Sequence, residues 1–269
     1  MFVKYDLDAK GTGHVFERLR LIEQESSCFQ QIEISDLDIL GRVLVLDNII
    51  QLSELDSDRY HESFCHIPLS NLSNPTSALI LGGGDGVLAK ELLKYRNMSI
   101  DLVDIDETVC RLSQIHLSHL NDGAFTNDRV SVYNEDALAF AKKSSSANKK
   151  YDIIFADITD PHPDSPSNSL LSKNALGIYK SILKKGGIFV AQTDNVQIAP
   201  THKNDMLCKL SECFQQTGSF GIAALTLSSI FSFVWASDDI IIKEMPLTIK
   251  TSWLTQERFD MCLKILRIH

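Results

Sequence analysis

The segment Ser77-Ala-Leu-Ile-Leu-Gly-Gly-Gly-Asp-Gly-Val87 decides the fold of this chain. Its apolar first half predicts a buried strand, and Leu88-Ala-Lys-Glu-Leu-Leu-Lys94 predicts the helix that follows. Gly82, Gly84 and Gly86 allow the backbone between them to turn tightly and to approach a ligand closely. The segment therefore predicts a strand, a glycine turn and a helix whose free N–H groups face a bound molecule.

The spacing of these glycines restricts the bound molecule. A dinucleotide fingerprint places its third glycine where this chain has Val87, so the turn favours a nucleoside without a pyrophosphate, and we expect a nucleoside sulfonium. Asp85 in the turn would repel a pyrophosphate or an amino-acid carboxylate and attract an ammonium group. Taken alone, the motif also fits a glycine-rich turn that binds nothing.

Composition sets broad limits on the class of protein. With 269 residues, 44% of them hydrophobic, the chain can bury a substantial core. It has 26 Lys and Arg against 35 Asp and Glu, a net charge of −9, which disfavours a nucleic-acid partner and suits a cationic ligand. No stretch resembles a secretory signal or a membrane span, so we expect a cytoplasmic protein without a membrane partner.

The six cysteines are spaced without any C-x-x-C pair and without a cluster of histidines beside them. This pattern indicates neither a zinc site nor a disulfide framework, so we expect reduced, structural thiols and no metal.

The first 70 residues are expected to form a small antiparallel β domain with a linking helix. Four short apolar runs predict strands, and Asn48 marks a hairpin tip between the last two because asparagine tolerates a left-handed conformation. From Glu54 to Leu69 the pattern becomes helical, and Asn71-Leu-Ser-Asn-Pro75 ends it. The predicted strands are 18–23, 29–34, 42–46 and 49–53.

Residues 71–269 are expected to form a second, larger domain. Strand and helix patterns alternate through it, which predicts a doubly wound, Rossmann-like parallel sheet covered by helices on both faces. Two late strands, near 221–227 and 230–236, should add an antiparallel pair, and a helix is expected within 255–267. The intermediate strands are predicted at 76–81, 99–104, 130–133, 151–156 and 187–191. The fold class is therefore α/β.

Acidic residues follow the predicted parallel strands. Ligands of open α/β sheets bind beyond the carboxyl ends of the strands, so these carboxylates should meet at one site. Asp104 lies about twenty residues beyond the glycines, where a carboxylate accepts hydrogen bonds from ribose hydroxyls, and Asp136 is placed to meet the exocyclic amine of an adenine. Asp136 and Asp106 also fit a simpler role as helix N-caps. The strand-end residues are Asp85, Asp104, Asp136, Asp157 and Asp160.

Several of these motifs together resemble those of spermidine synthase and the related polyamine aminopropyltransferases, over residues 18–240. The resemblance implies a small β domain on a methyltransferase-like domain, a homodimer, and decarboxylated S-adenosylmethionine as the co-substrate. The motifs are Gly-Arg-Val-Leu-Val-Leu-Asp-Asn-Ile-Ile-Gln (41–51), Tyr60-His-Glu62, His66-Ile-Pro-Leu69, Gly82-Gly-Gly-Asp-Gly86, Asp104-Ile-Asp106, Asp157-Ile-Thr-Asp-Pro161 and Gly186-Gly-Ile-Phe-Val-Ala-Gln192.

The resemblance also implies roles for single residues. Asp157 matches the catalytic proton acceptor of the family. Tyr60, His61, Asp85 and Asp160 match residues that contact the polyamine, although a lone histidine such as His61 is commonly a packed helix residue. The positions that match donor contacts are Gln30, Gly82, Gly84, Asp85, Asp104, Asp136 and Ala137.

A proton acceptor is also a chemical requirement of amine alkylation. An alkyl amine with a pKa near ~10.4 is mostly protonated at pH 7, and freeing its lone pair costs roughly 4 kcal/mol. Asp157 is the candidate, because burial and the charges of Asp85 and Asp160 are expected to raise its basicity. The same carboxylates would hold a second ammonium group of the acceptor.

Three segments depart from the family pattern. The loop at 161–169 is two residues longer, Leu225-Thr-Leu-Ser-Ser229 replaces a segment whose tyrosine walls the acceptor pocket, and the chain after residue 240 shows no family motif. The loss of that tyrosine predicts a wider end to the amine channel, in which a longer or branched acceptor competes better with a short diamine. The opposite is expected if the longer loop at 161–169 folds into the gap. Two other functions stay open: an S-adenosylmethionine-dependent amine N-methyltransferase, and a non-catalytic polyamine- or nucleoside-binding homologue.

Overall fold

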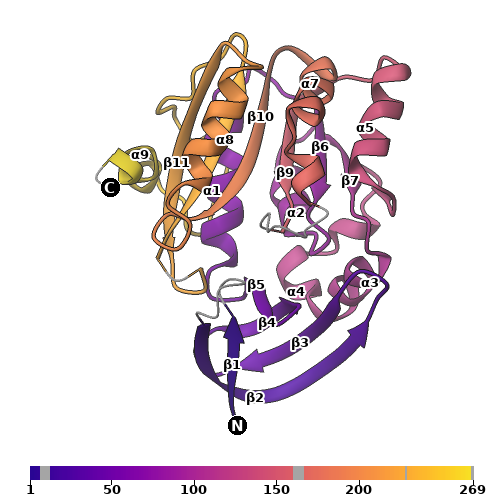
Figure 1. Cartoon of the computed structure of the whole chain (residues 1–269), viewed down its shortest axis with the longest axis vertical. Coiled ribbons are helices and arrows are strands. Elements are labelled where there is room, and N and C mark those ends of the chain that lie inside the picture. The colour runs from indigo at the N-terminus through magenta and orange to yellow at the C-terminus, as the bar shows by residue number, and fades with distance from the viewer. Residues whose placement is uncertain (7–12, 160–166, 228, 268–269) are drawn as a thin grey trace.

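The computed structural model describes residues 1–6, 13–159, 167–227 and 229–267. In Figure 1 a β-barrel lies at the bottom and a helix-covered sheet stands above it. Within the described residues the barrel is closed by five strands: β1 (Phe2–Asp6), β2 (Gly13–Ser26), β3 (Gln31–Leu37), β4 (Gly41–Leu46) and β5 (Ile49–Ser53).

The barrel confirms the antiparallel strands expected near the N-terminus and adds one. Asp47 and Asn48 both adopt left-handed conformations, with φ of 45° and 66°, and form the predicted hairpin tip. The added strand, β1, was not predicted; it pairs with β2 and closes the barrel through a parallel contact between Asp6 and Ile49. The buried side chain of Tyr5 accounts for this strand, because it enters the apolar barrel interior.

The sheet has the order β11-β12-β10-β9-β6-β7-β8 in the described part of the chain. Its strands are parallel except β12, which runs antiparallel to both neighbours, so the predicted parallel sheet with a final antiparallel pair is confirmed. Its strands are β6 (Ser77–Gly82), β7 (Ser99–Val103), β8 (Val130–Tyr133), β9 (Tyr151–Asp157), β10 (Leu183–Asn195), β11 (Gln216–Ala224) and β12 (Ser229–Ser237).

Helices cover both faces of this sheet. Phe64 of α1, Leu92 of α2 and Phe259 of α9 belong to the apolar core on one face, whereas Phe140 of α5 and Leu176 of α7 belong to the core on the other. The longer helices are α1 (Ser57–Leu69), α2 (Val87–Leu93), α3 (Glu107–His116), α5 (Ala137–Ser146), α7 (Lys173–Ser181), α8 (His202–Ser211) and α9 (Gln256–Lys264). Short helical turns are α4 (Ser118–Asn121), η1 (Ala124–Thr126), α6 (Ser167–Leu170) and η2 (Ile265–Arg267).

Apolar side chains join the barrel to the sheet. Ile34 and Leu44 of the barrel belong to one buried cluster with Val109, Leu112 and Leu117 of the α3 region. This packing fixes the barrel beside the carboxyl ends of the central strands, where the predicted site lies. Helix α1 packs on the sheet, and a division into domains at residue 70 stays a prediction.

Candidate active site

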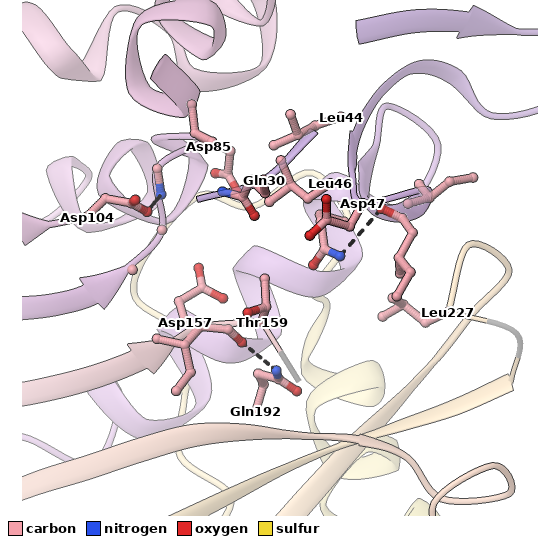
Figure 2. A pocket seen from close by; sticks show the side chains of 18 of the residues that line it. Gln30, Leu44, Leu46, Asp47, Asp85, Asp104, Asp157, Thr159, Gln192 and Leu227 are labelled. Carbon is pink, nitrogen blue, oxygen red and sulfur yellow. Dashed lines mark hydrogen bonds between the residues drawn. The ribbon is translucent and has the colours of Figure 1, made fainter. Parts of the chain in front are cut away.

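A cavity of about 410 Å³ lies between the barrel and the carboxyl ends of the strands. Figure 2 shows Asp85, Asp104 and Asp157 on one side of it and Leu44 and Leu46 of β4 on the other. A volume of this size is typical of sites that bind small molecules. The structure therefore brings four of the strand-end carboxylates, those of Asp85, Asp104, Asp136 and Asp157, to one cavity.

The glycine turn between β6 and α2 forms the floor of this cavity. Gly82 has φ of +84°, and a Cβ there would lie 2.2 Å from the backbone oxygen of Asp157. A Cβ on Gly84 would lie 2.6 Å from Oδ2 of Asp104. No side chain fits at either contact, so these glycines let two strand-end loops approach each other closely.

Asp104 is held by the backbone on both of its oxygens. The N–H of Gly84 donates to Oδ2 at 2.9 Å, and the N–H of Asp106 donates to Oδ1 at 2.9 Å. Burial raises the pKa of Asp104 to about 6, the charges of Asp106 and Asp85 add to the increase, and these two hydrogen bonds oppose it. The carboxylate is consequently fixed in orientation at the cavity wall, where a polar ligand group can reach it.

Asp157 ends β9 and lies beside two aromatic rings of α1. The hydroxyl of Tyr60 donates to Oδ1 at 2.9 Å, whereas Oδ2 is buried and has no hydrogen-bond partner among the described residues. Burial and, after it, the neighbouring charge of Asp85 raise the pKa of Asp157 to about 6, although His61 and Tyr60 oppose the shift. A carboxylate of this kind is suited to accepting a proton near neutral pH.

His61 is both packed and part of the cavity wall. Its Nδ1 donates to the backbone oxygen of Ser57 at 2.8 Å, one helical turn earlier, which directs Nε2 toward Asp85 at 3.8 Å from Oδ1. Ligand atoms of His61, Asp85 and Asp157 lie within 4.8 Å of one another. Such a set could hold a divalent cation, and equally an ammonium group, which also favours two adjacent carboxylates.

The remaining predicted donor contacts also line the cavity. Gln30 donates through Nε2 to Oδ2 of Asp106 at 2.9 Å, which ties the loop before β3 to the start of α3. Asp136 caps α5 by accepting from the N–H of Ala139 at 2.7 Å, so its expected N-cap role is confirmed, and with Ala137 it borders the cavity. Asp160 lies outside the described residues.

A family model for the spermine/spermidine synthase domain matches residues 57–245. The chain belongs to this family. The match spans the glycine turn and the strand-end carboxylates, so the resemblance inferred from the motifs is confirmed.

Relatives of this family match most of the chain. A polyamine aminopropyltransferase from Aeropyrum pernix is 34% identical over 220 residues, which are 81% of this chain and 69% of the relative. Another from Erwinia tasmaniensis is 30% identical over 250 residues, 92% of this chain and 86% of the relative. The names of these relatives describe a transferase.

Solved structures of spermidine synthases have the same fold. The crystal structure of the enzyme from Thermotoga maritima matches 98% of this chain and 90% of its own, with a TM-score of 0.89 and 24% identity. A spermidine synthase in complex with the transition-state analogue AdoDATO matches with a TM-score of 0.88 and 24% identity, over 98% of this chain and 91% of its own.

Thr226, in the segment 225–229 that departs from the family pattern, is fixed at the cavity edge. The N–H of Thr226 donates to Oδ2 of Asp56 at 2.8 Å, and its hydroxyl lies 2.6 Å from that of Ser53. Leu227 lines the cavity, and Ser228 lies outside the described residues. Of the longer loop, residues 161–166 also lie outside them, so its part in the site stays a prediction.

Some lining residues were missed by sequence reasoning. Gln192 donates through Nε2 to the backbone oxygen of Ile158 at 2.6 Å, directly beside Asp157. It ends one of the family motifs, and that position was the available signal. Leu44 and Leu46 gave no such signal, because inward-facing leucines of a barrel and those of a ligand wall have the same sequence pattern.

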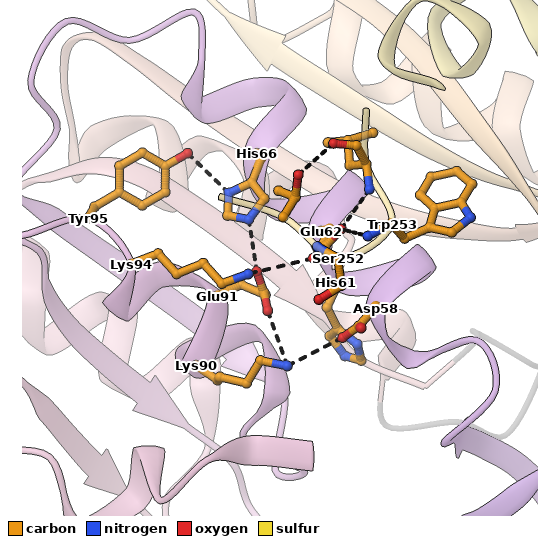
Figure 3. A network of polar contacts seen from close by, with 12 residues as sticks. Asp58, His61, Glu62, His66, Lys90, Glu91, Lys94, Tyr95, Ser252 and Trp253 are labelled. Carbon is orange, nitrogen blue, oxygen red and sulfur yellow. Dashed lines mark hydrogen bonds and ion pairs between the residues drawn. The ribbon is translucent and has the colours of Figure 1, made fainter. Parts of the chain in front are cut away.

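Behind the site, α1 takes part in a buried charge network, shown in Figure 3. Glu62 accepts hydrogen bonds from the backbone N–H groups of Ser252, Trp253 and Leu254 at 2.5, 2.8 and 2.7 Å. Lys94 lies 3.6 Å from Glu62 and 2.5 Å from the buried Glu91. The segment after residue 240, which had no family motif, is thus anchored to the helix that carries Tyr60 and His61.

The same network contains a second cluster of carboxylates, Asp58, Glu62 and Glu91. Lysine ammonium groups lie against these side chains, Lys90 at 3.4 Å from Asp58 and at 3.2 Å from Glu91. The carboxylates are therefore paired with cations of the chain itself.

Helices of the described segments are all too short or too polar to cross a membrane.

Proposed function

We propose that this protein transfers the aminopropyl group of decarboxylated S-adenosylmethionine to a primary amine of a di- or polyamine and releases 5′-methylthioadenosine. Membership of the spermine/spermidine synthase family and the names of the relatives support this activity. The observation that carries the proposal is Asp157, whose buried Oδ2 has no hydrogen-bond partner among the described residues and whose pKa is raised to about 6.

The reaction needs a proton to leave the attacking nitrogen. The amine lone pair attacks the carbon beside the sulfonium, the carbon–sulfur bond breaks, and its electrons neutralise the sulfur. The proton displaced from the nitrogen passes to Asp157, which is ionised at neutral pH and works as a general base because its pKa is raised only to about 6.

The carboxylates of the site favour a donor without its own carboxylate. Asp85 and Asp157 lie together at the cavity wall, and the charge of Asp85 reaches Asp157 strongly enough to raise its pKa. An ammonium group is attracted there, whereas the carboxylate of intact S-adenosylmethionine is repelled. In this proposal Gln30, Gly82, Gly84, Asp104, Asp136 and Ala137 bind the nucleoside part, and Tyr60, His61, Asp85 and Asp160 contact the amine.

The test is incubation of the pure protein with the decarboxylated donor and a panel of amines, followed by mass spectrometry. We expect an amine to gain one aminopropyl group while methylthioadenosine accumulates. If none gains it, the protein is not an aminopropyltransferase for that panel. Calorimetric titration with the two donors separates the methyltransferase alternative, because a methyltransferase would bind the carboxylated donor at least as tightly.

We also propose that the protein works as a homodimer in the cytoplasm, on the basis of the resemblance to its family. Light scattering coupled to size-exclusion chromatography measures the mass of the particle. A mass equal to that of one 30.1 kDa chain at micromolar concentration would contradict the dimer.

A further inference from the structure

Asp194 has an unusual backbone conformation beside the cavity. Its φ is +81°, in the left-handed region that glycine adopts readily and other residues rarely do. The pairing of β10 with β12 loses its regular register between Gln192 and Asn195, on either side of this residue. Such irregularities redirect side chains and are frequent next to active sites, and strained residues persist where their surroundings hold them.

Hydrogen bonds hold Asp194 in this conformation. Its N–H donates to Oε1 of Gln192 at 3.0 Å, and the hydroxyl of Ser232 donates to its backbone oxygen at 3.1 Å. The N–H of Asn195 donates to Oδ1, while Oδ2 lies 3.3 Å from Nδ1 of His202. The side chain is only 13% exposed and lines the cavity, so a charged group is built into the wall.

Gln192 connects the backbone of Asp194 to the strand end that carries Asp157. While its Oε1 accepts from Asp194, its Nε2 donates to the backbone oxygen of Ile158, the residue after Asp157. Asp157 and Asp194 therefore lie at the ends of neighbouring parallel strands, and Gln192 bridges the backbone of Ile158 and that of Asp194. They line the same cavity at separate places.

The wall beside Asp194 is largely apolar. Leu227, Ile198 and Phe231 line this part of the cavity, and the ring of Phe231 lies 5.8 Å from that of Tyr60. Methylene groups of an extended amine bury favourably against such side chains, and a cation at the far end of the amine is stabilised by a carboxylate rather than by an apolar surface.

We propose that Asp194 is a specificity-determining residue that holds the remote ammonium group of the acceptor. The inference rests on the proposed function and deepens it. The preferred acceptor then carries positive charge at both ends, with one nitrogen at Asp157 and another at Asp194, and a monoamine with an apolar tail is a poor substrate. This role is additional to that expected of Asp160.

The test uses acceptors that differ only in the remote charge. The ratio of kcat/KM for 1,4-diaminobutane over that for 1-aminobutane, and for spermidine over 1-aminobutane, reports recognition of the second ammonium. Asp194→Asn keeps a residue that tolerates the left-handed conformation, and Asp194→Gly relaxes the backbone, while both remove the charge. Asp205→Asn, an exposed position on α8, is the matched control.

We expect the larger of the two ratios to fall at least tenfold in both Asp194 variants and to stay within twofold of wild type in the control. Equal losses for the acceptors with and without the remote charge would show that Asp194 only supports the wall, and would overturn the proposal. Unchanged ratios would overturn it as well.

A binding measurement separates this inference from the proposed function. Titration of the same amines into protein saturated with methylthioadenosine needs no turnover. If wild-type protein forms no product, the proposed activity fails, and the inference is then decided by whether Asp194→Asn weakens binding of the diamine or of spermidine tenfold relative to 1-aminobutane. Unweakened binding contradicts the role of Asp194 even if turnover is normal.

Discussion

The hydroxyl of Tyr60 donates a hydrogen bond of 2.9 Å to Oδ1 of Asp157, across 97 residues of sequence. The bond leaves Oδ2 as the oxygen that can receive a proton, and it stabilises the ionised form of the carboxylate. Tyr60 thus orients the proposed proton acceptor and lowers the basicity that burial and Asp85 give it.

Replacing Asp157 by asparagine removes proton acceptance while keeping the size of the side chain. We expect kcat to fall about 10²–10⁴-fold, the range for a lost general base. Affinity for the decarboxylated donor should change far less, because Asp104 and the glycine turn remain. Steady-state kinetics and donor titration on one preparation measure both, and a variant within a few fold of wild-type turnover would place proton transfer elsewhere.

Replacing Tyr60 by phenylalanine should shift the pH profile. In the wild-type protein this hydrogen bond stabilises the charged form of Asp157. Without it, the pKa of Asp157 rises above the wild-type value of about 6. Activity requires the ionised carboxylate, and the acidic limb of kcat/KM therefore moves to higher pH. A profile that only decreases in height, without moving, would contradict the role of this bond.

The raised pKa of Asp157 should also reduce the stability of the folded protein. The pKa rises from the ordinary 3.8 to about 6 on folding, so the contribution of this group is favourable at low pH and is lost as the pH rises from about 4 through 6. The thermal midpoint of Asp157→Asn, relative to wild type, is expected to increase between pH 4 and pH 7. A difference independent of pH would contradict a raised pKa.

Gly84→Ala should weaken donor binding. The added Cβ would lie 2.6 Å from Oδ2 of Asp104, and the carboxylate has to move from its bonds to the backbone. We expect the dissociation constant of methylthioadenosine to rise at least tenfold, and Asp104→Asn to raise it as well. Gly177→Ala is the matched control because a Cβ there meets nothing within 4 Å. If Gly84→Ala and Asp104→Asn bind methylthioadenosine as tightly as the control does, Asp104 is excluded from the donor site.

Glu62→Gln should destabilise the protein. The substitution leaves the N–H groups of the segment 252–254 without the buried charged acceptor and leaves Lys94 with one carboxylate fewer. Removing one partner of a buried charged contact costs about 3–5 kcal/mol. Denaturant titration measures the loss, and the exposed Glu257→Gln should stay within about 0.5 kcal/mol of wild type. A comparable loss in both variants would contradict the anchoring role.

The parts of the site that local sequence determines were predictable. The glycine turn and the strand-end residues Asp85, Asp104 and Asp157 follow from an apolar run, its breakers and the rule that parallel strands end at one edge. The contact between Tyr60 and Asp157 could not be predicted in this way, because no local sequence pattern indicates that a helix residue contacts a strand end 97 residues away. Their shared site was expected only through the family motifs.

Other features depend on contacts that no sequence pattern carries. Gln30 meets Asp106 across 76 residues, and the same carboxylate accepts from the hydroxyl of Ser27. The left-handed conformation of Asp194 arises from the mismatch between β10 and β12, which is a property of two paired strands. In the sequence, residues 225–227 could be recognised only as a departure from the family pattern. The structure shows that Thr226 is held by hydrogen bonds with Asp56 and Ser53.

The anchoring of Glu62 has a consequence for the order of events during synthesis. Its partners lie 190 to 192 residues later in the chain, so the buried charge has no backbone donors when α1 leaves the ribosome. The barrel can close early because its strands are local, whereas the helix that presents Tyr60 and His61 gains its final support only after the whole sheet has emerged. A nascent chain stalled before residue 250 should therefore expose α1 to proteases and chaperones while its barrel is already folded.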